Sequence, residues 1–396
     1  MKCLLATKKV RTPEPENPFF DPSFLKVCIL TLLAGVTVFT YTILPRDLRH
    51  LGMGDDSIGI VMGGFFLGLL LGIRPSEIVM RRWGIRALVL SGVLLMTTSG
   101  ILFLTAKAII PLWIARVTQG LGWSGVVVGS ITWVTVLIPR DRTAQGIGLH
   151  GLLFQISQAV GPGLAEIVVG RYSFPILFLI GIALTGLSGL CATFTPAPPH
   201  SEVSSSAAEA SGRETWALRG AVLSLAVGFG CVMSFLADYV PSIGTHSVGG
   251  FFAAYVAVNI LVRVIYGARL DRGNRIRIIN VASISQAAVL AGLAMTMSPW
   301  QLVPLGAMFG FAIALYLPVF QALIVDLVAD RGRAIATFQF WYLLGATLAS
   351  SLLGFVAAIA GYRVVFGLAA VIAGFAVGFL KLDQVTSKAV SLSRLE

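Results

Sequence analysis

Long apolar runs recur along the whole chain, with short polar segments between them. A helix that crosses a membrane needs about 20 apolar residues to pass about 30 Å of hydrocarbon. Twelve runs approach or exceed this length. We expect helices at residues 24–45, 57–76, 87–106, 109–137, 144–169, 174–193, 218–240, 249–269, 278–298, 300–327, 334–360 and 364–381. The pattern predicts an all-α membrane protein with twelve transmembrane helices.

Composition favours lipid surroundings. Hydrophobic residues make up 56% of the 396 residues and charged residues only 12%, against about a quarter charged in ordinary soluble proteins. A net charge of +11 is compatible with nucleic-acid binding in general. Here, however, the Lys and Arg residues stand in short runs between apolar stretches and form no basic patch on a soluble domain. We therefore expect the lipid bilayer as a partner and no nucleic acid.

The Lys and Arg residues predict the orientation, because short loops rich in them stay in the cytoplasm. With the N-terminus inside, 21 of the 29 lie on inner tails and loops and three lie within helices. The five on the outer side are Arg46, Arg49, Lys107, Arg171 and Arg363. We predict that both termini are cytoplasmic. The first residues have no apolar core of signal-peptide length, and the compact loops fit a bacterial inner membrane.

A polar segment divides the chain into halves. Residues 195–216 are rich in Pro, Ser, Ala and Glu, which is the composition of a linker and not of a packed core. We predict a cytoplasmic N-terminal tail (1–23), a six-helix bundle (24–193), a cytoplasmic linker (194–217), a second six-helix bundle (218–381) and a cytoplasmic C-terminal tail (382–396).

The halves resemble each other at one offset. A shift of 189 residues places Arg86 on Arg275 and Arg74 on Arg263, at equivalent positions of the expected helices. This internal similarity predicts a 6+6 pseudo-repeat. Arg74 and Arg263 could both face a cavity and bind an anionic solute, or their side chains could reach the membrane surface.

Two segments carry a family signature. Residues 116–122 read Arg-Val-Thr-Gln-Gly-Leu-Gly, and residues 267–275 read Gly-Ala-Arg-Leu-Asp-Arg-Gly-Asn-Arg. They resemble the fourth-helix and inner-loop signatures of the major facilitator superfamily, although the loop is one residue short. The resemblance implies secondary transport without a cofactor, by two bundles around a site near the membrane midplane. It also implies a monomer, the usual state of the family.

Arg116 and Gln119 belong to the fourth-helix signature. A guanidinium in hydrocarbon is costly unless it faces a polar cavity or a partner. In the family this arginine is tied to proton coupling, because a fixed positive charge favours loss of a proton from a nearby carboxylic acid. The alternative is a structural arginine that donates hydrogen bonds to carbonyls of a neighbouring helix.

The inner-loop signature implies a gate. Asp271, at a helix end, could pair with the positive end and the arginine of a neighbouring bundle; the alternative is that it only caps a turn. The first copy of the loop departs from the family, because Arg82 stands where Asp271 stands in the second. We expect a charge-reversed pair there. The candidate gating residues are Gly267, Asp271, Arg272, Gly273, Arg275, Arg82, Asp326 and Asp330.

The fifth expected helix contains Gly161-Pro162-Gly163. This partly resembles the Gly-Pro signature of family members that exchange protons for exported solutes. Glycine permits close helix approach, and proline frees a carbonyl, so we expect a bend at Gly161 and Pro162. Because Gly and Pro are frequent in membrane helices, the signature favours export only modestly.

Proton coupling requires a carboxylate that changes its protonation state. Asp238, near the outer end of the seventh expected helix, is the first candidate, and Glu166 is the second. Helices one, four, seven and ten would line the cavity of the resembling fold, so we expect an amphipathic organic solute beside their aromatic residues. Alternatively, these residues pack or face lipid. The aromatic candidates are Tyr41, Trp123, Tyr239 and Tyr316.

The sequence contains no signature of nucleotide hydrolysis, zinc proteolysis or serine hydrolysis. Its four cysteines stand far apart, so no metal site is expected. We predict a non-enzymatic transporter that exports a small solute in exchange for protons. The alternatives are a proton-coupled uptake symporter of the same fold and a transporter-like sensor or scaffold.

Overall fold

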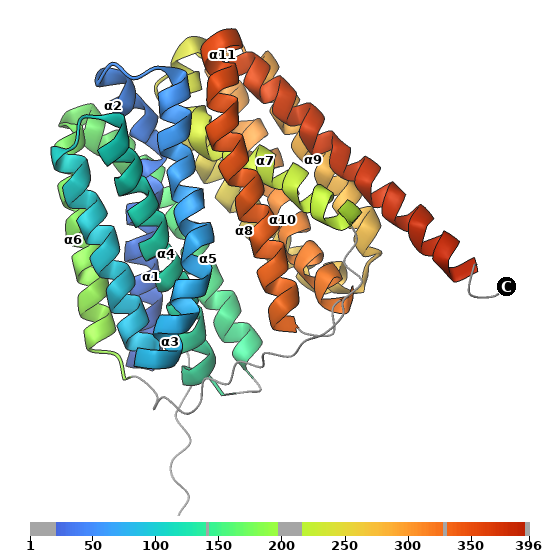
Figure 1. Cartoon of the computed structure of the whole chain (residues 1–396), viewed down its shortest axis with the longest axis horizontal. Helices are drawn as coiled ribbons and strands as arrows, with labels where there is room; N and C mark the ends of the chain where they lie inside the picture. Colours follow the sequence, from blue (N-terminus) through green and yellow to red (C-terminus); the bar gives the residue numbers. More distant parts are fainter. Residues whose placement is uncertain (1–20, 140–141, 197–215, 328–330, 393–396) are drawn as a thin grey trace, which may run out of the picture.

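The computed structural model describes residues 21–139, 142–196, 216–327 and 331–392, and these contain helices but no β-strand (Figure 1). Ten segments of the described residues are long and apolar enough to cross a membrane. In chain order the helices are α1 (Pro22–Thr40), η2 (Tyr41–Ile43), α2 (Leu44–His50), α3 (Asp55–Thr105), α4 (Ile109–Leu137), α5 (Thr143–Arg171), α6 (Phe174–Thr193), α7 (Trp216–Tyr239), η4 (Val240–Ile243), α8 (Gly249–Arg272), α9 (Arg275–Met295), η5 (Pro299–Gln301), α10 (Leu302–Leu327) and α11 (Arg331–Leu392).

Helices α3 and α11 each cover two of the expected apolar runs. Each breaks at a glycine with positive φ: Gly84, with φ 86°, in α3 and Gly361, with φ 78°, in α11. Other residues adopt this backbone conformation only with strain, whereas glycine adopts it readily. The count of ten arises because α3 and α11 each continue through such a break. Helix α11 also extends to Leu392, over residues expected to form a tail.

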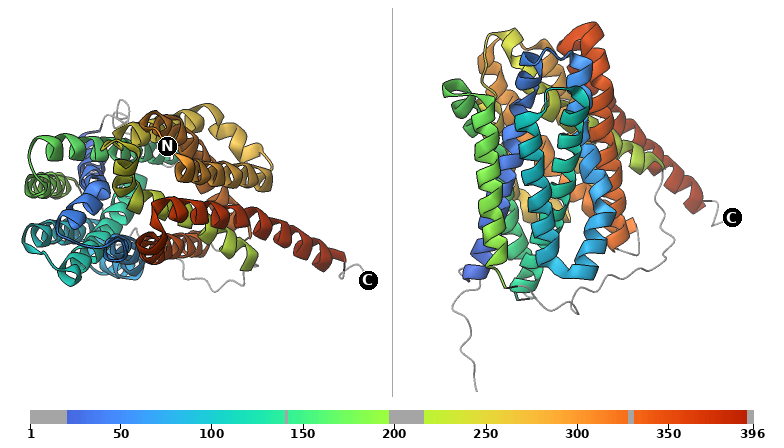
Figure 2. Two further views of the ribbon diagram at one scale, coloured as in Figure 1. Left: turned by 90° about the horizontal axis from the view of Figure 1, so that it is seen from above. Right: turned by 60° about the vertical axis from the view of Figure 1, so that its left-hand side comes forward.

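The helices form two groups, as Figures 1 and 2 show. Helices α1 to α6 form the N-terminal group, in which α3 packs on α4, and α7 to α11 form the C-terminal group, in which α11 packs on α7. The groups touch each other mainly through α3 on α11 and α5 on α8. We call the end of the molecule at which α2 lies the α2 end. In Figure 1 the two groups meet there and diverge toward the opposite end.

Glycines bring α3 and α11 together. A Cβ atom added to Gly59 would lie 2.7 Å from the Cα of Gly354 and 2.6 Å from the carbonyl oxygen of Ser350. Small residues allow this close approach of two backbones, which is a common packing mode in membranes.

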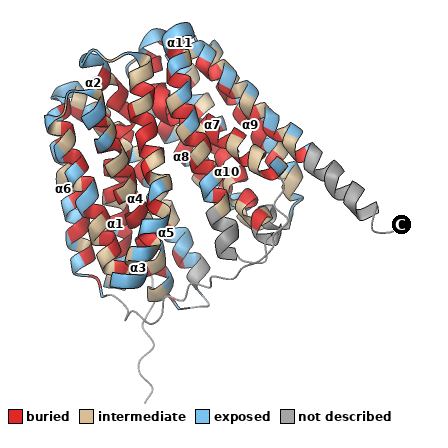
Figure 3. Cartoon of the chain, in the orientation of Figure 1, coloured by how far each residue is buried: buried red, intermediate tan, exposed pale blue. Residues whose placement is uncertain are grey.

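Exposed residues lie on the outward faces of the helices (Figure 3), and many of them are large and apolar, as expected for a lipid-facing surface. Ile359, Val264 and Ile110 are 89%, 71% and 68% exposed. Such exposure of large apolar side chains is costly in water but not in hydrocarbon.

Candidate substrate cavity and ion-pair network

A cavity of about 250 Å³ lies between the two groups of helices. Its walls come from α1, η2, α3, α4 and α5 on one side and from α7, α8, α10 and α11 on the other. The lining residues are Val38, Phe39, Thr42, Met62, Phe65, Phe66, Leu69, Arg116, Trp123, Phe154, Gln158, Phe229, Met233, Tyr255, Leu317, Gln321, Phe338, Gln339, Tyr342 and Leu343. Nine of these 20 residues are aromatic and six are aliphatic, and the wall also contains three amide side chains and one charge, that of Arg116.

Arg116 is 4% exposed and lies in the cavity wall. Its Nη1 donates a hydrogen bond to Oε1 of Gln119, one turn further along α4, and its Nη2 lies 3.7 Å from the sulfur of Met62. The guanidinium also lies over the ring of Phe65, at 4.9 Å from the centroid, and over Tyr41 at 5.7 Å. The fourth-helix signature thus places an arginine and its amide partner together beside the cavity.

Of the four aromatic candidates, Trp123 lines the cavity. Its ring stacks on that of Phe154, with the centroids 5.9 Å apart. Tyr41 lies behind Arg116 in the N-terminal group, where it stacks on Phe178 with a centroid distance of 5.6 Å.

Tyr239 and Tyr316 are both buried and do not appear in the cavity wall. The hydroxyl of Tyr239 donates to the carbonyl oxygen of Leu293 in α9 at 2.8 Å. Tyr316 lies one layer behind Tyr342, with ring centroids 6.4 Å apart. Their aromatic rings therefore contribute to packing within the C-terminal group.

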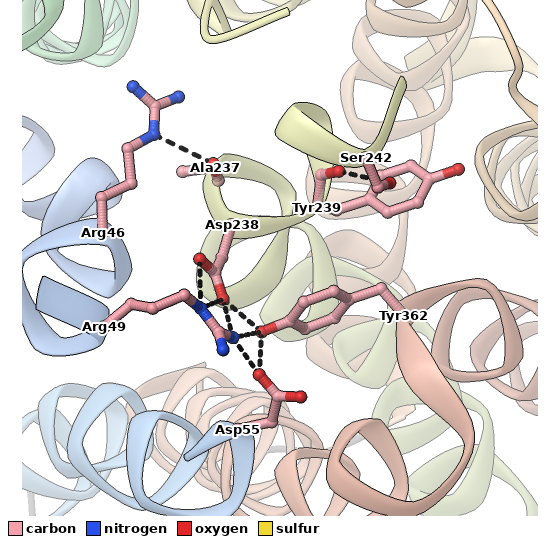
Figure 4. A network of polar contacts seen from close by, with 8 residues as sticks. All are labelled: Arg46, Arg49, Asp55, Ala237, Asp238, Tyr239, Ser242 and Tyr362. Carbon is pink, nitrogen blue, oxygen red and sulfur yellow. Dashed lines mark hydrogen bonds and ion pairs between the residues drawn. The ribbon is translucent and has the colours of Figure 1, made fainter. Parts of the chain in front are cut away.

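A network of charged and hydroxyl groups joins four helices at the α2 end (Figure 4). Arg49, in the last turn of α2, donates from Nε to both carboxylate oxygens of Asp238 at 3.0 Å, and its Nη2 also contacts Asp238 and Asp55. The hydroxyl of Tyr362 donates to Asp55 at 2.8 Å and contacts Asp238. The side chain of Asp238 is 3% exposed and that of Arg49 46%.

The backbone places these four groups. Asp238 is the penultimate residue of α7, and Asp55 is the first residue of α3. Tyr362 follows Gly361 directly, so the break in α11 sets its position. The network therefore ties the N-terminal group to the C-terminal group.

Glu166 makes a second connection at the α2 end. From α5, its carboxylate accepts hydrogen bonds from the hydroxyl of Ser247 at 2.9 Å and from the backbone N–H groups of Val248 and Gly249 at the start of α8. A carboxylate at a helix N-terminus is stabilised by unpaired N–H groups and the helix dipole. Arg46 lies 3.9 Å from Glu166 and donates to the carbonyl oxygen of Ala237 at 3.0 Å.

Further along the same contact, α5 and α8 share a buried hydrogen bond. The hydroxyl of Tyr255 donates to Oε1 of Gln158 at 2.8 Å, and both residues line the cavity. The α5–α8 contact thus leads from Glu166 at the α2 end to the cavity wall.

Only part of the candidate gating set is described, and this part lies at the opposite end. Arg275 donates to the carbonyl oxygen of Ala322 in α10 at 2.9 Å, and the guanidinium of Arg82 lies 5.4 Å from the ring centroid of Trp83. A Cβ added to Gly267 would meet nothing within 4 Å, and Gly273 is exposed. The side chains of Asp271, Arg272, Asp326 and Asp330 lie outside the described part of the structure, so the expected pairs stay predictions.

Three further predicted positions can be placed. Arg74 is exposed, Arg263 is half-buried in α8, and the cavity wall contains neither. Helix α5 runs through Pro162 without interruption. A Cβ added to Gly161 would lie 2.6 Å from that of Phe39, so α5 approaches α1 closely at this point. No cluster of three or more potential metal ligands occurs among the described residues.

Comparison with models of known protein families identifies the family of the chain. The model of the Major Facilitator Superfamily matches residues 27–309 and, in an overlapping second match, residues 220–395. The chain belongs to the Major Facilitator Superfamily. It is therefore a multi-pass membrane transporter and not an enzyme, as the sequence predicts.

Two bacterial proteins are similar to this chain in sequence. An uncharacterized MFS-type transporter of Burkholderia pseudomallei is 29% identical over 311 residues, which are 76% of this chain and 74% of that protein. The multidrug resistance protein Stp of Mycobacterium tuberculosis is 28% identical over 145 residues, 36% of this chain and 27% of that protein.

Solved structures of other superfamily transporters share the fold. The nucleoside transporter NupG superposes with a TM-score of 0.76 at 13% identity, and the human organic anion transporter MFSD10 with 0.64 at 15% identity. Each comparison covers 91% of this chain and 99% of the other. At this identity the likeness shows the fold alone.

Sequence reasoning missed Arg49, Asp55 and Tyr362, which stand at helix ends and resemble ordinary loop residues. One signal could have found Arg49. It precedes Asp238 by 189 residues, the offset that relates the two halves. Opposite charges at equivalent positions of a repeat are candidates for a pair near its symmetry axis, because only close to that axis do equivalent positions lie close together.

Proposed function

We propose that this chain is a secondary transporter with twelve transmembrane crossings, which exports a small organic solute in exchange for protons by alternating access. The observation that carries the proposal is the cavity between the two helix groups, together with the ion-pair network that joins the groups at the α2 end.

The lengths of two helices support twelve crossings. Helix α3 has 51 residues, about 76 Å at the usual rise, which is more than twice the hydrocarbon thickness of about 30 Å. When each side of the breaks in α3 and α11 is counted as one crossing, each half of the chain has six crossings. The two halves then correspond to the predicted bundles at 24–193 and 218–381. The pairing of Arg49 with Asp238 across an offset of 189 residues also supports two repeats related by an axis along the membrane normal.

We assign the α2 end to the outer face, because the sequence places its loops outside and its Lys- and Arg-rich tails and loops in the cytoplasm. The contacts of Arg49 with Asp238 and of Glu166 with the start of α8 then close the outer side. The cavity wall also includes Gln321 of α10 and Gln339 of α11, from the halves of these helices that lie toward the other end. This arrangement corresponds to a conformation closed to the outside.

Asp238 is our candidate for the proton carrier. While ionised it accepts hydrogen bonds from Arg49, which holds the outer side closed. Protonation removes the charge and weakens this contact, so uptake of an outside proton favours opening. The contact with Arg49 forms again when the proton passes on to the cytoplasmic side, which couples closure to inward proton movement. The Gly161-Pro162 segment and the multidrug resistance protein among the relatives both favour export over uptake.

Proteoliposomes with a trapped pH-sensitive dye test the function. The panel of solutes contains aromatic acids, amides, nucleosides and cationic drugs. We expect the movement of at least one of them across the membrane to drive protons in the opposite direction. Asp238→Asn should abolish this flux, whereas Glu77→Gln, in an exposed ion pair on α3, should retain it. Proton and solute movement in the same direction would favour the uptake symporter, and no flux with any solute would favour a sensor or scaffold.

A further inference from the structure

Arg116 carries a buried charge without an opposite charge. Its side chain lies in the wall of the cavity, within α4. Among the described residues, no carboxylate oxygen lies within 4 Å of its guanidinium nitrogens. A buried charge without a counter-charge costs several kcal/mol. We therefore look for neighbouring groups that offset this cost.

The groups around Arg116 accept only some of the hydrogen bonds that its guanidinium can donate. A guanidinium has five N–H donors. The Gln119 oxygen accepts one hydrogen bond, and the sulfur of Met62 is a weak acceptor. The ring face of Phe65 adds a cation–π contact. The Nε atom of Arg116 is buried without a hydrogen-bond partner in the structure.

A ligand in the cavity would lie beside this guanidinium. The cavity wall contains Arg116 and also Met62 and Phe65, the side chains that flank its charged group. The planar fork of arginine matches the two oxygens of a carboxylate and binds them with charge-assisted hydrogen bonds. An anion is thus the ligand chemistry that completes the site.

The remaining wall favours an aromatic body on this anion. Trp123 and Phe154 present stacked rings, and Gln158 and Gln321 offer neutral amides. No carboxylate belongs to the described lining, so an organic cation would meet only the like charge of Arg116. The volume of about 250 Å³ lies near the lower end of small-molecule sites, which suits a body of one or two rings.

We propose that the transported solute is an aromatic organic anion, and that Arg116 binds its carboxylate. This inference rests on the proposed transport function, since it names the substrate class of the same cavity. Binding of the solute is a different role for Arg116 from the proton coupling that the family signature implies. Solute binding requires a charged group only on the solute, whereas proton coupling requires a carboxylic acid of the protein near Arg116.

Equilibrium binding to the purified full-length chain in detergent tests this without a proton gradient. The probes are benzoate, 2-naphthoate and indole-3-carboxylate, each compared with its neutral primary amide by calorimetry. We expect at least one acid to bind about tenfold to a hundredfold more tightly than its amide. Arg116→Gln should remove this preference, and Arg116→Lys should retain part of it. Arg171→Gln, which removes an exposed charge at the end of α5, should leave it unchanged.

Equal binding of acids and amides would overturn the proposal, as would an acid preference that survives in Arg116→Gln, or the absence of acid binding at millimolar concentration. If Arg116→Gln fails to fold, the Arg116→Lys variant and the acid–amide comparison on the native chain still test the proposal. Acid binding without any proton flux would refute proton-coupled transport but not the anion site. Proton flux driven only by neutral or cationic solutes would refute the anion site but not transport.

Discussion

Asp238 has the least exposed carboxylate among the ion pairs of the described residues, with 3% of its side chain accessible. Loss of its partner would leave a buried charge. We predict that Asp238→Asn and Arg49→Gln each lower the free energy of unfolding by about 1–3 kcal/mol. Because Arg49 is partly exposed, we expect a coupling of about 1 kcal/mol in the double mutant. Denaturant unfolding in detergent measures all three variants.

The exposed pair of Glu77 and Arg81 is the matched control. Their side chains are 44% and 47% exposed, so the corresponding cycle with Glu77→Gln and Arg81→Gln should give a coupling below about 0.5 kcal/mol. Strictly additive effects of Asp238→Asn and Arg49→Gln would mean that the pair does not hold the two groups together.

The sequence singled out some of the candidate side chains and not others, for a physical reason. A charge such as Arg116 inside an apolar run is costly wherever the helix packs, so local sequence is enough to single it out. Arg49 and Tyr362 stand at helix ends, where charged and polar residues are ordinary. Their position beside Asp238 depends on how two helix groups pack, and hydrophobic pattern alone does not specify that.

Helix α5 offers a comparison of two glycines on either side of one proline. Gly161 lies against Phe39 of α1, whereas a Cβ added to Gly163 would meet nothing within 4 Å. We predict that Gly161→Ala lowers the free energy of unfolding by about 1–3 kcal/mol through overpacking. Gly163→Ala should be neutral or stabilise by up to about 1 kcal/mol. Equal effects in thermal unfolding would indicate that glycine serves helix bending here, and not close packing.

Hydrophobic pattern predicted the elements better than their ends. The gap between the expected helices 57–76 and 87–106 contains Gly84, where α3 breaks, although helical geometry continues on both sides. Residues 382–392 were expected to form a tail, yet α11 continues through them. A polar segment can be helical as readily as it can be a tail, because helicity depends on backbone hydrogen bonds that hydrophobicity does not report.

Among the described residues, the two main contacts between the groups are α3 on α11 and α5 on α8, and the repeat relates them. The offset of 189 residues carries Gly59, which lies against Gly354 in the α3–α11 contact, onto Val248, which binds Glu166 in the α5–α8 contact. One contact is a close approach of glycines and the other is polar. Movement of the groups therefore separates packed backbone on one side and breaks hydrogen bonds on the other.

The central claim is that ionised Asp238 holds the outer side closed and that its protonation opens it. The distance between spin labels at Leu51→Cys and His246→Cys, exposed positions in the two groups, tests this in a chain whose native cysteines are replaced by alanine. We predict a short distance at neutral pH and a population several ångströms longer at acidic pH, with Asp238→Asn giving the longer distance at both. A distance unaffected by pH and by Asp238→Asn would contradict the claim.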